Sequence, residues 1–190
     1  MRFIFWNIRG FGHAGRRTQL REFIRNEEID VVGLQETIKA DFNHRDLLAV
    51  DPLERFVWHW VPAVGHSGGL LLGVNLVCLE VVAWDAGRFS LSAHARHRAT
   101  LQEWMVIGMY GPANHSLSLE FLEELQTKVR AVGVSNLPLL VGGDFNLIRS
   151  GADKNNGIIN WSRVAMFNNA IASMALREVA RVGARYTWTN

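Results

Sequence analysis

Four short apolar runs, each ending in polar side chains, are the feature of this sequence that most constrains its fold. RFIFWNI carries Asn7 near its end, and IDVVGLQE ends with Gln35 and Glu36. MVIGMYG carries Tyr110 near its end, and PLLVGGDFN carries Asp144 and Asn146 at its end. Such runs are typical of buried β-strands, and neighbouring strands of one sheet end at a common edge. Residues 142–146 also fit an ordinary turn after a strand, because Gly, Asp and Asn favour turns. The sequence therefore predicts a sheet with a polar edge, and a plain turn at Asp144 is the alternative.

The rest of the pattern predicts an α/β protein in which helices are interspersed among many strands. Helices are expected at 16–28, with Leu20, Phe23 and Ile24 on the apolar face, at 116–133, with Gly133 as the C-terminal cap, and at 161–174. Further strands are expected at 56–63, 68–75, 76–84, 91–101, 103–111 and 184–190. The hairpin-like strand pairs favour a mixed α/β sandwich. A dinucleotide-binding sheet is excluded because the loop GFGHAG lacks the G-x-G-x-x-G spacing.

Length and composition indicate one globular domain over residues 1–190. Hydrophobic residues make up 48% of the 190 and charged residues 20%, close to the average for globular proteins. No apolar run reaches the ~18 residues that a membrane span requires, and the N-terminal apolar stretch is too short for a signal peptide. We expect a soluble, intracellular protein without a membrane partner. The single cysteine, Cys78, excludes an intrachain disulfide and is expected in a strand core.

The charge balance is only mildly basic, with a net charge of +2 and a sequence pI of about 9.0. Of the 20 basic residues, 17 are arginines. Arginine offers paired donors that suit phosphate, although the base composition of the coding sequence produces the same bias.

The polar residues at the strand ends are rich in oxygen donors. Carboxylates and carboxamides without cysteine suit a hard cation such as Mg²⁺, which uses one or two carboxylates and keeps several waters. A divalent cation beside a carboxylate, with amide donors nearby, suits phosphoryl chemistry.

Six short motifs carry a family resemblance over nearly the whole chain. They are WNIRG (6–10), LQET (34–37), HSGG (66–69), MYGP (109–112), GGDFN (142–146) and YTW (186–188), in that order. The set resembles the endonuclease/exonuclease/phosphatase superfamily, which includes abasic-site endonucleases, DNase I-like nucleases, sphingomyelinases and inositol-phosphate phosphatases. WNIRG together with MYGP is most similar to the endonuclease domain of plant LINE-type non-LTR retrotransposons. The resemblance implies a DNase I-like four-layered α/β sandwich, with two mixed, mainly antiparallel sheets flanked by helices.

The resemblance also implies roles for the polar strand ends. Glu36 would be the main ligand of Mg²⁺ or Mn²⁺, assisted by Asn7. Asp144 would orient and deprotonate the attacking water, and Asn146 would hold the scissile phosphate. Tyr110 would contact the same phosphate, or pack as an ordinary strand residue.

Further residues receive lesser roles from the resemblance. Ser67, Gly68 and Gly69 would shape the loop under the site, and Trp188 would flank a DNA groove or belong to the core.

DNA is the partner that the resemblance implies, with nuclear localisation if the chain acts as a retroelement endonuclease. Abasic-site endonucleases often carry an acidic residue at the position of Arg9. Retroelement sequences commonly carry Arg there, as this chain does. Arg9, Arg96 and Arg98 are candidate contacts to the DNA backbone, with a solvated face as the alternative. A reverse transcriptase domain would follow in the complete element, and no obligate protein partner is indicated.

The chain departs from the family pattern at its end. Family members finish with an Asp-containing segment and a Ser-Asp-His motif, whereas this sequence stops at Asn190 and contains no Ser-Asp-His. We therefore expect the domain to be incomplete at its C-terminus, with terminal strands missing. Because one positioned acid–base group is worth ~10²–10⁴ in rate, we expect low activity from these residues alone.

Two alternatives remain open at this stage. The first is an enzyme of the same superfamily with a substrate other than DNA, such as a phosphoinositide or sphingomyelin, because the metal and water chemistry is shared. The second is a non-catalytic remnant that only binds DNA or a metal ion.

Overall fold

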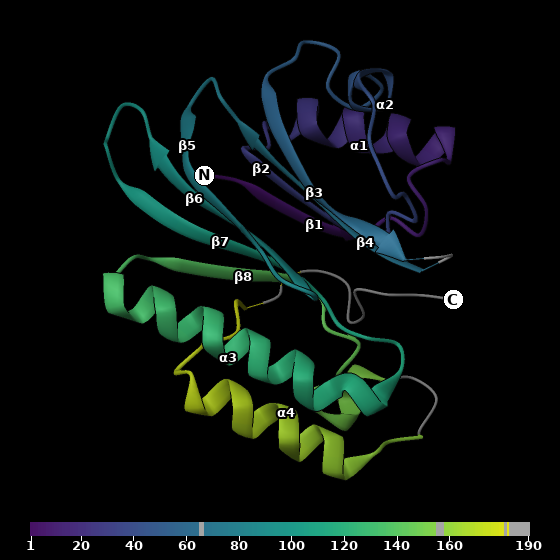
Figure 1. Ribbon diagram of the computed structural model, residues 1–190, viewed down its shortest axis with the longest axis vertical. Helices are drawn as coiled ribbons and strands as arrows, with labels where there is room; N and C mark the ends of the chain where they lie inside the picture. Colours follow the sequence, from purple (N-terminus) through teal and green to yellow (C-terminus); the bar gives the residue numbers. More distant parts are fainter. Residues whose placement is uncertain (65–66, 155–157, 181, 183–190) are drawn as a thin grey trace.

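The computed structural model describes residues 1–64, 67–154, 158–180 and 182, and shows four layers (Figure 1). Two four-stranded sheets face each other in the middle, and helices cover the outer face of each. The first sheet has the order β1-β2-β4-β3 and the second the order β5-β6-β7-β8. The predicted α/β sandwich of two mixed, mainly antiparallel sheets is confirmed.

The first sheet begins with a parallel pair. Its strands are β1 (Phe3–Asn7), β2 (Val31–Gln35), β3 (Phe56–Val64) and β4 (Ser67–Asn75). The crossover between β1 and β2 contains α1 (Ala14–Asn26), which covers the outer face together with α2 (His44–Leu48) (Figure 1). Asn7 lies opposite Gln35 in the parallel register, so both strands end at the same edge. The other two pairings of this sheet are antiparallel.

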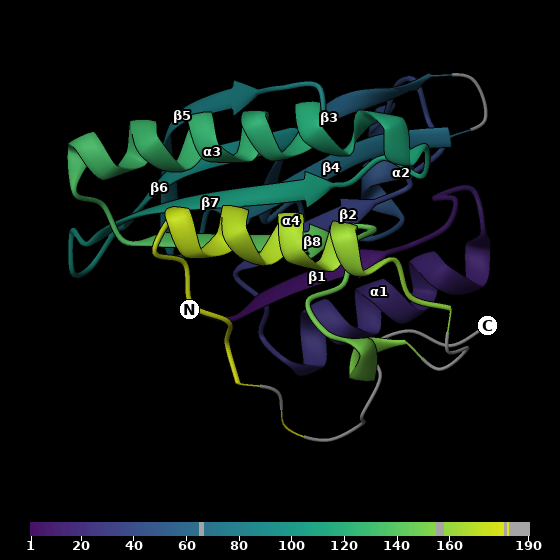
Figure 2. The same ribbon diagram turned by 90° about the horizontal axis from the view of Figure 1, so that it is seen from below.

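The second sheet ends with a parallel pair of strands, as the first sheet begins with one. Its strands are β5 (Leu79–Ala86), β6 (Ser90–His97), β7 (Glu103–Tyr110) and β8 (Leu139–Asp144). β5, β6 and β7 form an antiparallel meander, and β8 runs parallel to β7 with Tyr110 opposite Asp144. The connection between β7 and β8 contains η1 (His115–Leu117) and α3 (Ser118–Ser135). After β8 come η2 (Gly151–Asp153) and α4 (Trp161–Ser173), and α4 lies beside α3 on the outer face (Figures 1 and 2).

Phe5 of β1 fills space between the sheets that glycines leave open. A Cβ built on Gly33 of β2 would lie 2.5 Å from the Phe5 ring, and one built on Gly142 of β8 would lie 2.3 Å from it. Around this ring, strands of both sheets contribute a common core that includes Leu72, Val74, Leu91 and Ala93. The glycines therefore allow β1 to pack closely against β8.

Two further hydrophobic clusters lie between each sheet and its outer helices and hold these helices in place. Phe11 and Leu20 pack with Phe42 and Leu34 under α1, while Phe121 and Phe167 hold α3 and α4 against β7 and β8. Among the described residues, no helix is long and apolar enough to cross a membrane.

Several local predictions are wrong at their boundaries. α3 continues past Gly133 and ends at Ser135, because Asn136 adopts the left-handed conformation at φ 52° and supplies the cap. Phe23 is 42% exposed and not part of the apolar face of α1, which buries Leu20. The short helix α2 has too few residues for a periodic signal and was not predicted. The expected strand 184–190 lies outside the described residues.

Cys78 lies in the turn before β5 and not in a strand core. It is half-buried, and its Sγ donates a hydrogen bond of 3.1 Å to Oδ1 of Asp30. Burial and the neighbouring Asp30 carboxylate raise the pKa of the Cys78 thiol to about 11. The thiol is therefore protonated and unreactive at neutral pH.

We expect Gly142→Ala to destabilise the protein by ~1–3 kcal/mol, because the new methyl group would collide with the Phe5 ring. Gly15→Ala in α1 is the matched control, since a Cβ there has no heavy atom within 4 Å and alanine favours a helix. Denaturant unfolding measures both. Equal stability of Gly142→Ala and the wild type would contradict the close packing of β1 on β8.

Alkylation of Cys78 by iodoacetamide at pH 8 should be much slower in the folded protein than in urea. A rise in the pKa of the thiol from 9.0 to about 11 reduces the thiolate fraction roughly 100-fold, since each unit is tenfold. Asp30→Asn removes the neighbouring charge and should speed the reaction. Identical rates for the variant and the wild type would show that Asp30 does not control this thiol.

Candidate active site at the shared strand edge

A hydrogen bond between Asn7 and Asp144 joins the two sheets at one edge. Asn7 is the last residue of β1, and Asp144 is the last residue of β8. Nδ2 of Asn7 donates to Oδ2 of Asp144 at 2.7 Å, and both side chains are partly buried. The two polar strand ends, which are 137 residues apart in the sequence, therefore form one site.

The loop after β8 fixes the second oxygen of the Asp144 carboxylate. Oδ1 of Asp144 accepts a hydrogen bond of 3.0 Å from the backbone N–H of Asn146, which lies in the left-handed region at φ 49°. Nδ2 of Asn146 donates in turn to the carbonyl oxygen of Gly111, at 2.7 Å. A Cβ on Gly111 would lie 1.9 Å from the carbonyl oxygen of Phe145. Only glycine at position 111 therefore allows the loop after β7 to contact the loop after β8. This contact fixes the orientation of Asp144 and Asn146.

Glu36 follows β2 directly and is held in an uncommon backbone conformation. Its φ of 55° lies in the left-handed region, which non-glycine residues rarely adopt. Its carbonyl oxygen accepts a hydrogen bond of 2.7 Å from the N–H of Gly10 in the loop after β1. The neighbouring N–H of Thr37 donates to the carbonyl oxygen of Gly69, at 3.2 Å. Backbone contacts on both sides thus direct the Glu36 side chain toward the edge where β1 and β8 end.

The glycines of the HSGG motif support this segment. Gly68 and Gly69 both have positive φ, and the carbonyl oxygen of Gly68 accepts a hydrogen bond of 3.1 Å from Ile38. A Cβ on Gly69 would lie 2.3 Å from Oγ1 of Thr37, which is fully buried. Ser67 is the first residue of β4, opposite Val64. The motif therefore lies directly beside the segment that carries Glu36.

Tyr110 contributes a hydroxyl group to the same edge. It ends β7, opposite Asp144, and its backbone N–H donates to Phe89. Burial raises the pKa of Tyr110 to about 12, with further contributions from the charges of Glu36 and Asp144 and from a hydrogen bond with Glu36. Tyr110 thus connects the carboxylates of the two sheets and is neutral at physiological pH.

The donor set suits a hard divalent cation. Asn7 ends β1, and Glu36 directly follows β2, the adjacent parallel strand. A carboxamide oxygen and a carboxylate therefore lie near each other. Oδ1 of Asn7 accepts one hydrogen bond, from the N–H of Arg9 at 3.2 Å, which leaves its second lone pair. In the described part of the chain, no cluster of three or more His, Cys, Asp or Glu side chains could hold a metal. One carboxylate, an amide oxygen and water is a set that fits Mg²⁺ or Mn²⁺, not Zn²⁺.

Gln35 and Arg9 both lie near this edge in the sequence, but Gln35 is buried and Arg9 is exposed. Gln35 is only 1% exposed, and its Nε2 donates to the carbonyl oxygen of Gly33 at 3.1 Å, so its side chain belongs to the core and not to the polar edge. Arg9 is exposed at φ 49°, immediately after the β1 end, and therefore lies beside the site.

Arg96 and Arg98 lie at the far end of the second sheet. Arg96 is opposite Glu103, and Glu103 is seven residues before Tyr110 on β7, which corresponds to ~23 Å. Arg96 pairs with Glu103 at 2.8 Å and with Glu80 at 3.1 Å. Arg98 donates to the carbonyl oxygens of Leu76, in the turn before β5, and of Leu79, the first residue of β5. The structure does not bring these two arginines to the candidate site, and Trp188 lies outside the described residues.

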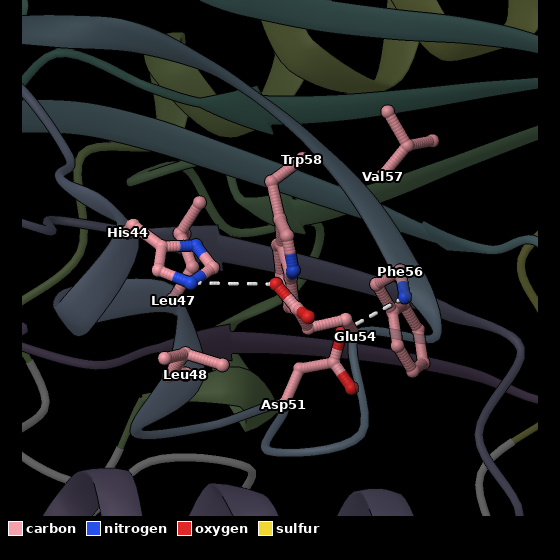
Figure 3. Close-up of a pocket in the computed structure, with 8 residues that line it drawn as sticks. All are labelled: His44, Leu47, Leu48, Asp51, Glu54, Phe56, Val57 and Trp58. Carbon is pink, nitrogen blue, oxygen red and sulfur yellow. Dashed lines mark hydrogen bonds and ion pairs between the residues drawn. The ribbon is translucent and has the colours of Figure 1, made fainter.

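A pocket in the first sheet lies away from this edge. It has a volume of about 230 Å³ and is lined by side chains of α2 and of the start of β3, including His44 and Trp58 (Figure 3). Phe56 pairs with Asn75, at the end of the first sheet opposite to Gln35. The candidate site therefore does not coincide with this pocket.

Gly111 and Thr37 are two residues whose role the sequence patterns left unassigned. Both stand inside quoted motifs, MYGP and LQET, directly after Tyr110 and Glu36. The contact of Gly111 with the loop after β8 joins segments 34 residues apart, so no short stretch of sequence indicates it.

Comparisons with known proteins agree with this architecture. A model of the endonuclease/exonuclease/phosphatase family matches residues 4–189. No curated protein matches the chain. Among solved structures, the Xenopus laevis APE2 catalytic domain has a TM-score of 0.68 at 17% identity, covering 90% of this chain and 67% of that one.

Two further solved structures come from Bacteroides thetaiotaomicron. A mannosyl-6-phosphatase has a TM-score of 0.62 at 15% identity, over 87% of this chain and 70% of that one. An endonuclease/exonuclease/phosphatase family protein has a TM-score of 0.58 at 15% identity, over 76% of this chain and 62% of that one. The chain thus spans roughly two thirds of the length of these proteins, and at such identities the likeness shows a shared DNase I-like fold. With the family model matched over nearly its whole length, the chain belongs to the endonuclease/exonuclease/phosphatase family.

Proposed function

We propose that this chain is the catalytic domain of a divalent-metal-dependent phosphodiesterase that nicks DNA, of the LINE-type retrotransposon kind. The observation that carries the proposal is the Asp144 carboxylate, held between the amides of Asn7 and Asn146 at the edge where Glu36 also lies. A fixed carboxylate beside a second acidic group and amide donors matches the demands of phosphodiester hydrolysis.

Asp144 is the group placed to activate water. Each of its oxygens accepts one hydrogen bond from an amide N–H, so the carboxylate keeps a defined orientation and retains lone pairs for an incoming proton. It therefore accepts the proton of the attacking water as a general base.

Asn146 and Tyr110 are the donors for the phosphate oxygens. One N–H of the Asn146 side chain is used by the carbonyl oxygen of Gly111, which fixes the amide and leaves its second N–H. Tyr110 keeps its proton because its pKa is raised to about 12. The second N–H of Asn146 therefore donates to the phosphate as negative charge develops, and the Tyr110 hydroxyl donates to it after exchanging its hydrogen bond with Glu36.

Glu36 and Asn7 would hold the metal ion. Bound there, a divalent cation would neutralise charge on the phosphate. The role of Asn7 is double, because the same side chain offers its oxygen to the cation and its N–H to Asp144.

DNA is proposed as the substrate because WNIRG and MYGP resemble retrotransposon endonucleases, and because basic residues give a pI of about 9.0. Localisation in the nucleus and a reverse transcriptase domain elsewhere in the protein belong to the same proposal. A phosphatase is the second candidate, supported by the shared fold of the mannosyl-6-phosphatase.

Glu36→Gln should reduce nicking of supercoiled plasmid by the full encoded protein at least ~100-fold in Mg²⁺, because it removes the only carboxylate proposed to bind the metal. Glu22→Gln on the exposed face of α1 is the matched control and should nick like the wild type. The assay follows conversion of supercoiled to open-circular DNA. Equal nicking by Glu36→Gln would refute the metal assignment, and a wild type that does not nick would refute the DNA proposal.

A further inference from the structure

Ile38 is a β-branched residue that is held in the left-handed backbone conformation, at φ 52°. Residues with a branched Cβ avoid this region because the side chain meets its own backbone, so Ile38 is a genuine outlier. Its side chain is also 38% exposed, although it is apolar. Strain of this kind persists only where surrounding contacts impose it, and it concentrates at functional sites.

Backbone hydrogen bonds on both sides fix Ile38 at the edge that carries Glu36. The N–H of Ile38 donates to the carbonyl oxygen of Gly68 in β4, at 3.1 Å. The carbonyl oxygen of Lys39, the next residue, accepts from the N–H of Ala63 in β3 at 2.9 Å. A turn of Ile38 to an ordinary conformation would disturb both hydrogen bonds. The ends of β3 and β4 therefore impose the strain.

The Ile38 side chain lies against the loop after β1, where Arg16 of α1 also lies. A Cβ built on Gly10 would lie 3.8 Å from Cδ1 of Ile38 and 3.9 Å from Nη1 of Arg16. The N–H of Gly10 donates to the carbonyl oxygen of Glu36 at 2.7 Å. Gly10 is three residues after Asn7, a separation of at most ~11 Å. Ile38 and Arg16 therefore meet over one glycine, beside the two proposed metal ligands.

The surface around Ile38 is apolar. Val64 follows Ala63 at the end of β3 and is 85% exposed. Lys39 follows Ile38, but its ammonium group pairs with Asp46 of α2 at 2.8 Å and is turned toward that helix. The side chain that Ile38 presents to a ligand is therefore an apolar one, with the guanidinium of Arg16 on one side.

A nucleotide is the ligand that matches an apolar side chain beside a guanidinium. Its phosphate suits the planar donors of arginine, and its sugar and base offer apolar faces. Nη1 of Arg16 donates to the carbonyl oxygen of Arg9, which orients the guanidinium and leaves its other N–H donors. A small phosphorylated sugar presents hydroxyl groups instead, and these lose hydration against isoleucine without gaining a hydrogen bond.

We propose that Ile38 contacts the sugar and base of a nucleotide next to the scissile phosphate, with Arg16 on the phosphate of that nucleotide. The proposal rests on the proposed function, because it takes the edge at Glu36 as the place of hydrolysis. It deepens that function by making the substrate a polynucleotide and Ile38 a determinant of its specificity. The Ile38 contact buries apolar area and releases no counterions, so its contribution to affinity is independent of salt.

The test measures binding of a fluorescent DNA duplex to the full encoded protein by anisotropy at several salt concentrations, in EDTA so that no cleavage occurs. Ile38→Asn should weaken binding roughly 5–20-fold at every salt concentration and leave the slope of log affinity against log salt unchanged. Arg16→Gln should instead reduce that slope by about one, because it removes a phosphate contact.

Leu101→Asn is the matched control. Leu101 is 69% exposed and has the same left-handed conformation, at φ 57°, in the turn between β6 and β7. It lies two residues before Glu103, at the end of β7 opposite to Tyr110. Asparagine tolerates the left-handed region, so both Asn variants should melt within a few degrees of the wild type. Leu101→Asn should bind DNA like the wild type.

Ile38→Gly is a second variant that removes the side chain and accepts the positive φ without strain. It should weaken DNA binding as Ile38→Asn does. Wild-type affinity in both Ile38 variants, or a reduced salt slope in either, would overturn the contact.

Kinetics of plasmid nicking separate a substrate contact from a role in positioning Glu36. Ile38→Asn should raise the KM for DNA and leave kcat close to that of the wild type, because the contact is made in the ground state and in the transition state alike. A lower kcat with an unchanged KM would show that Ile38 acts through Glu36 and would overturn the proposal.

The same measurements distinguish failure of this proposal from failure of the proposed function. Plasmid nicking by the wild type, with wild-type affinity in both Ile38 variants, overturns the nucleotide contact and leaves the endonuclease in place. Weaker binding by both variants of a protein that does not nick supports the nucleotide contact and overturns the endonuclease.

Discussion

The hydrogen bond from Asn7 to Asp144 is the contact on which the candidate site depends. It joins the last residue of β1 to the last residue of β8, and so connects the first sheet to the second. The parallel pairs, β1 with β2 and β7 with β8, bring the ends of β2 and β7 to the same edge as this contact. The contact requires close packing of the sheets, which the Phe5 ring achieves against Gly33 and Gly142. Packing in the core therefore sets the geometry of the polar edge.

The polar edge is built from backbone conformations that cost free energy. Glu36 and Asn146 both have positive φ, as does Arg9, two residues after Asn7. Non-glycine residues in this region cost of order 1 kcal/mol or more, and surrounding contacts must offset that cost. Hydrogen bonds within the loops offset this free-energy cost. They join Asn146 to Gly111 and Glu36 to Gly10. Such preorganisation is the physical basis for catalysis by fixed dipoles.

Much of the fold could be predicted from sequence because strand signals are local. The four apolar runs and their polar ends were found from the sequence pattern, and the structure brings Asn7, Asp144 and Tyr110 to one edge. The strand pattern alone did not distinguish Gln35 from Glu36, and the family resemblance singled out Glu36. These neighbours point to opposite sides of the strand end, and only packing shows that Gln35 is buried.

Other features depend on contacts that no short window contains. Arg96 was a candidate contact to the DNA backbone, yet Glu103 and Glu80 on adjacent strands pair with it. Long-range pairing, and not local propensity, therefore decides the environment of Arg96. The end of α3 also differs from the expected cap at Gly133, because the helix continues to Ser135 and Asn136 supplies the cap.

The central claim is that residues from both sheets form one metal-assisted phosphate site at the shared strand edge. Thermal unfolding with and without Mn²⁺ tests it most directly, because a cation that binds only the folded state raises the melting temperature. We expect a cooperative melt that Mn²⁺ shifts upward in the wild type, a much smaller shift in Glu36→Gln, and an unchanged shift in Glu22→Gln. An equal shift in all three proteins, or no shift in the wild type, would contradict the account.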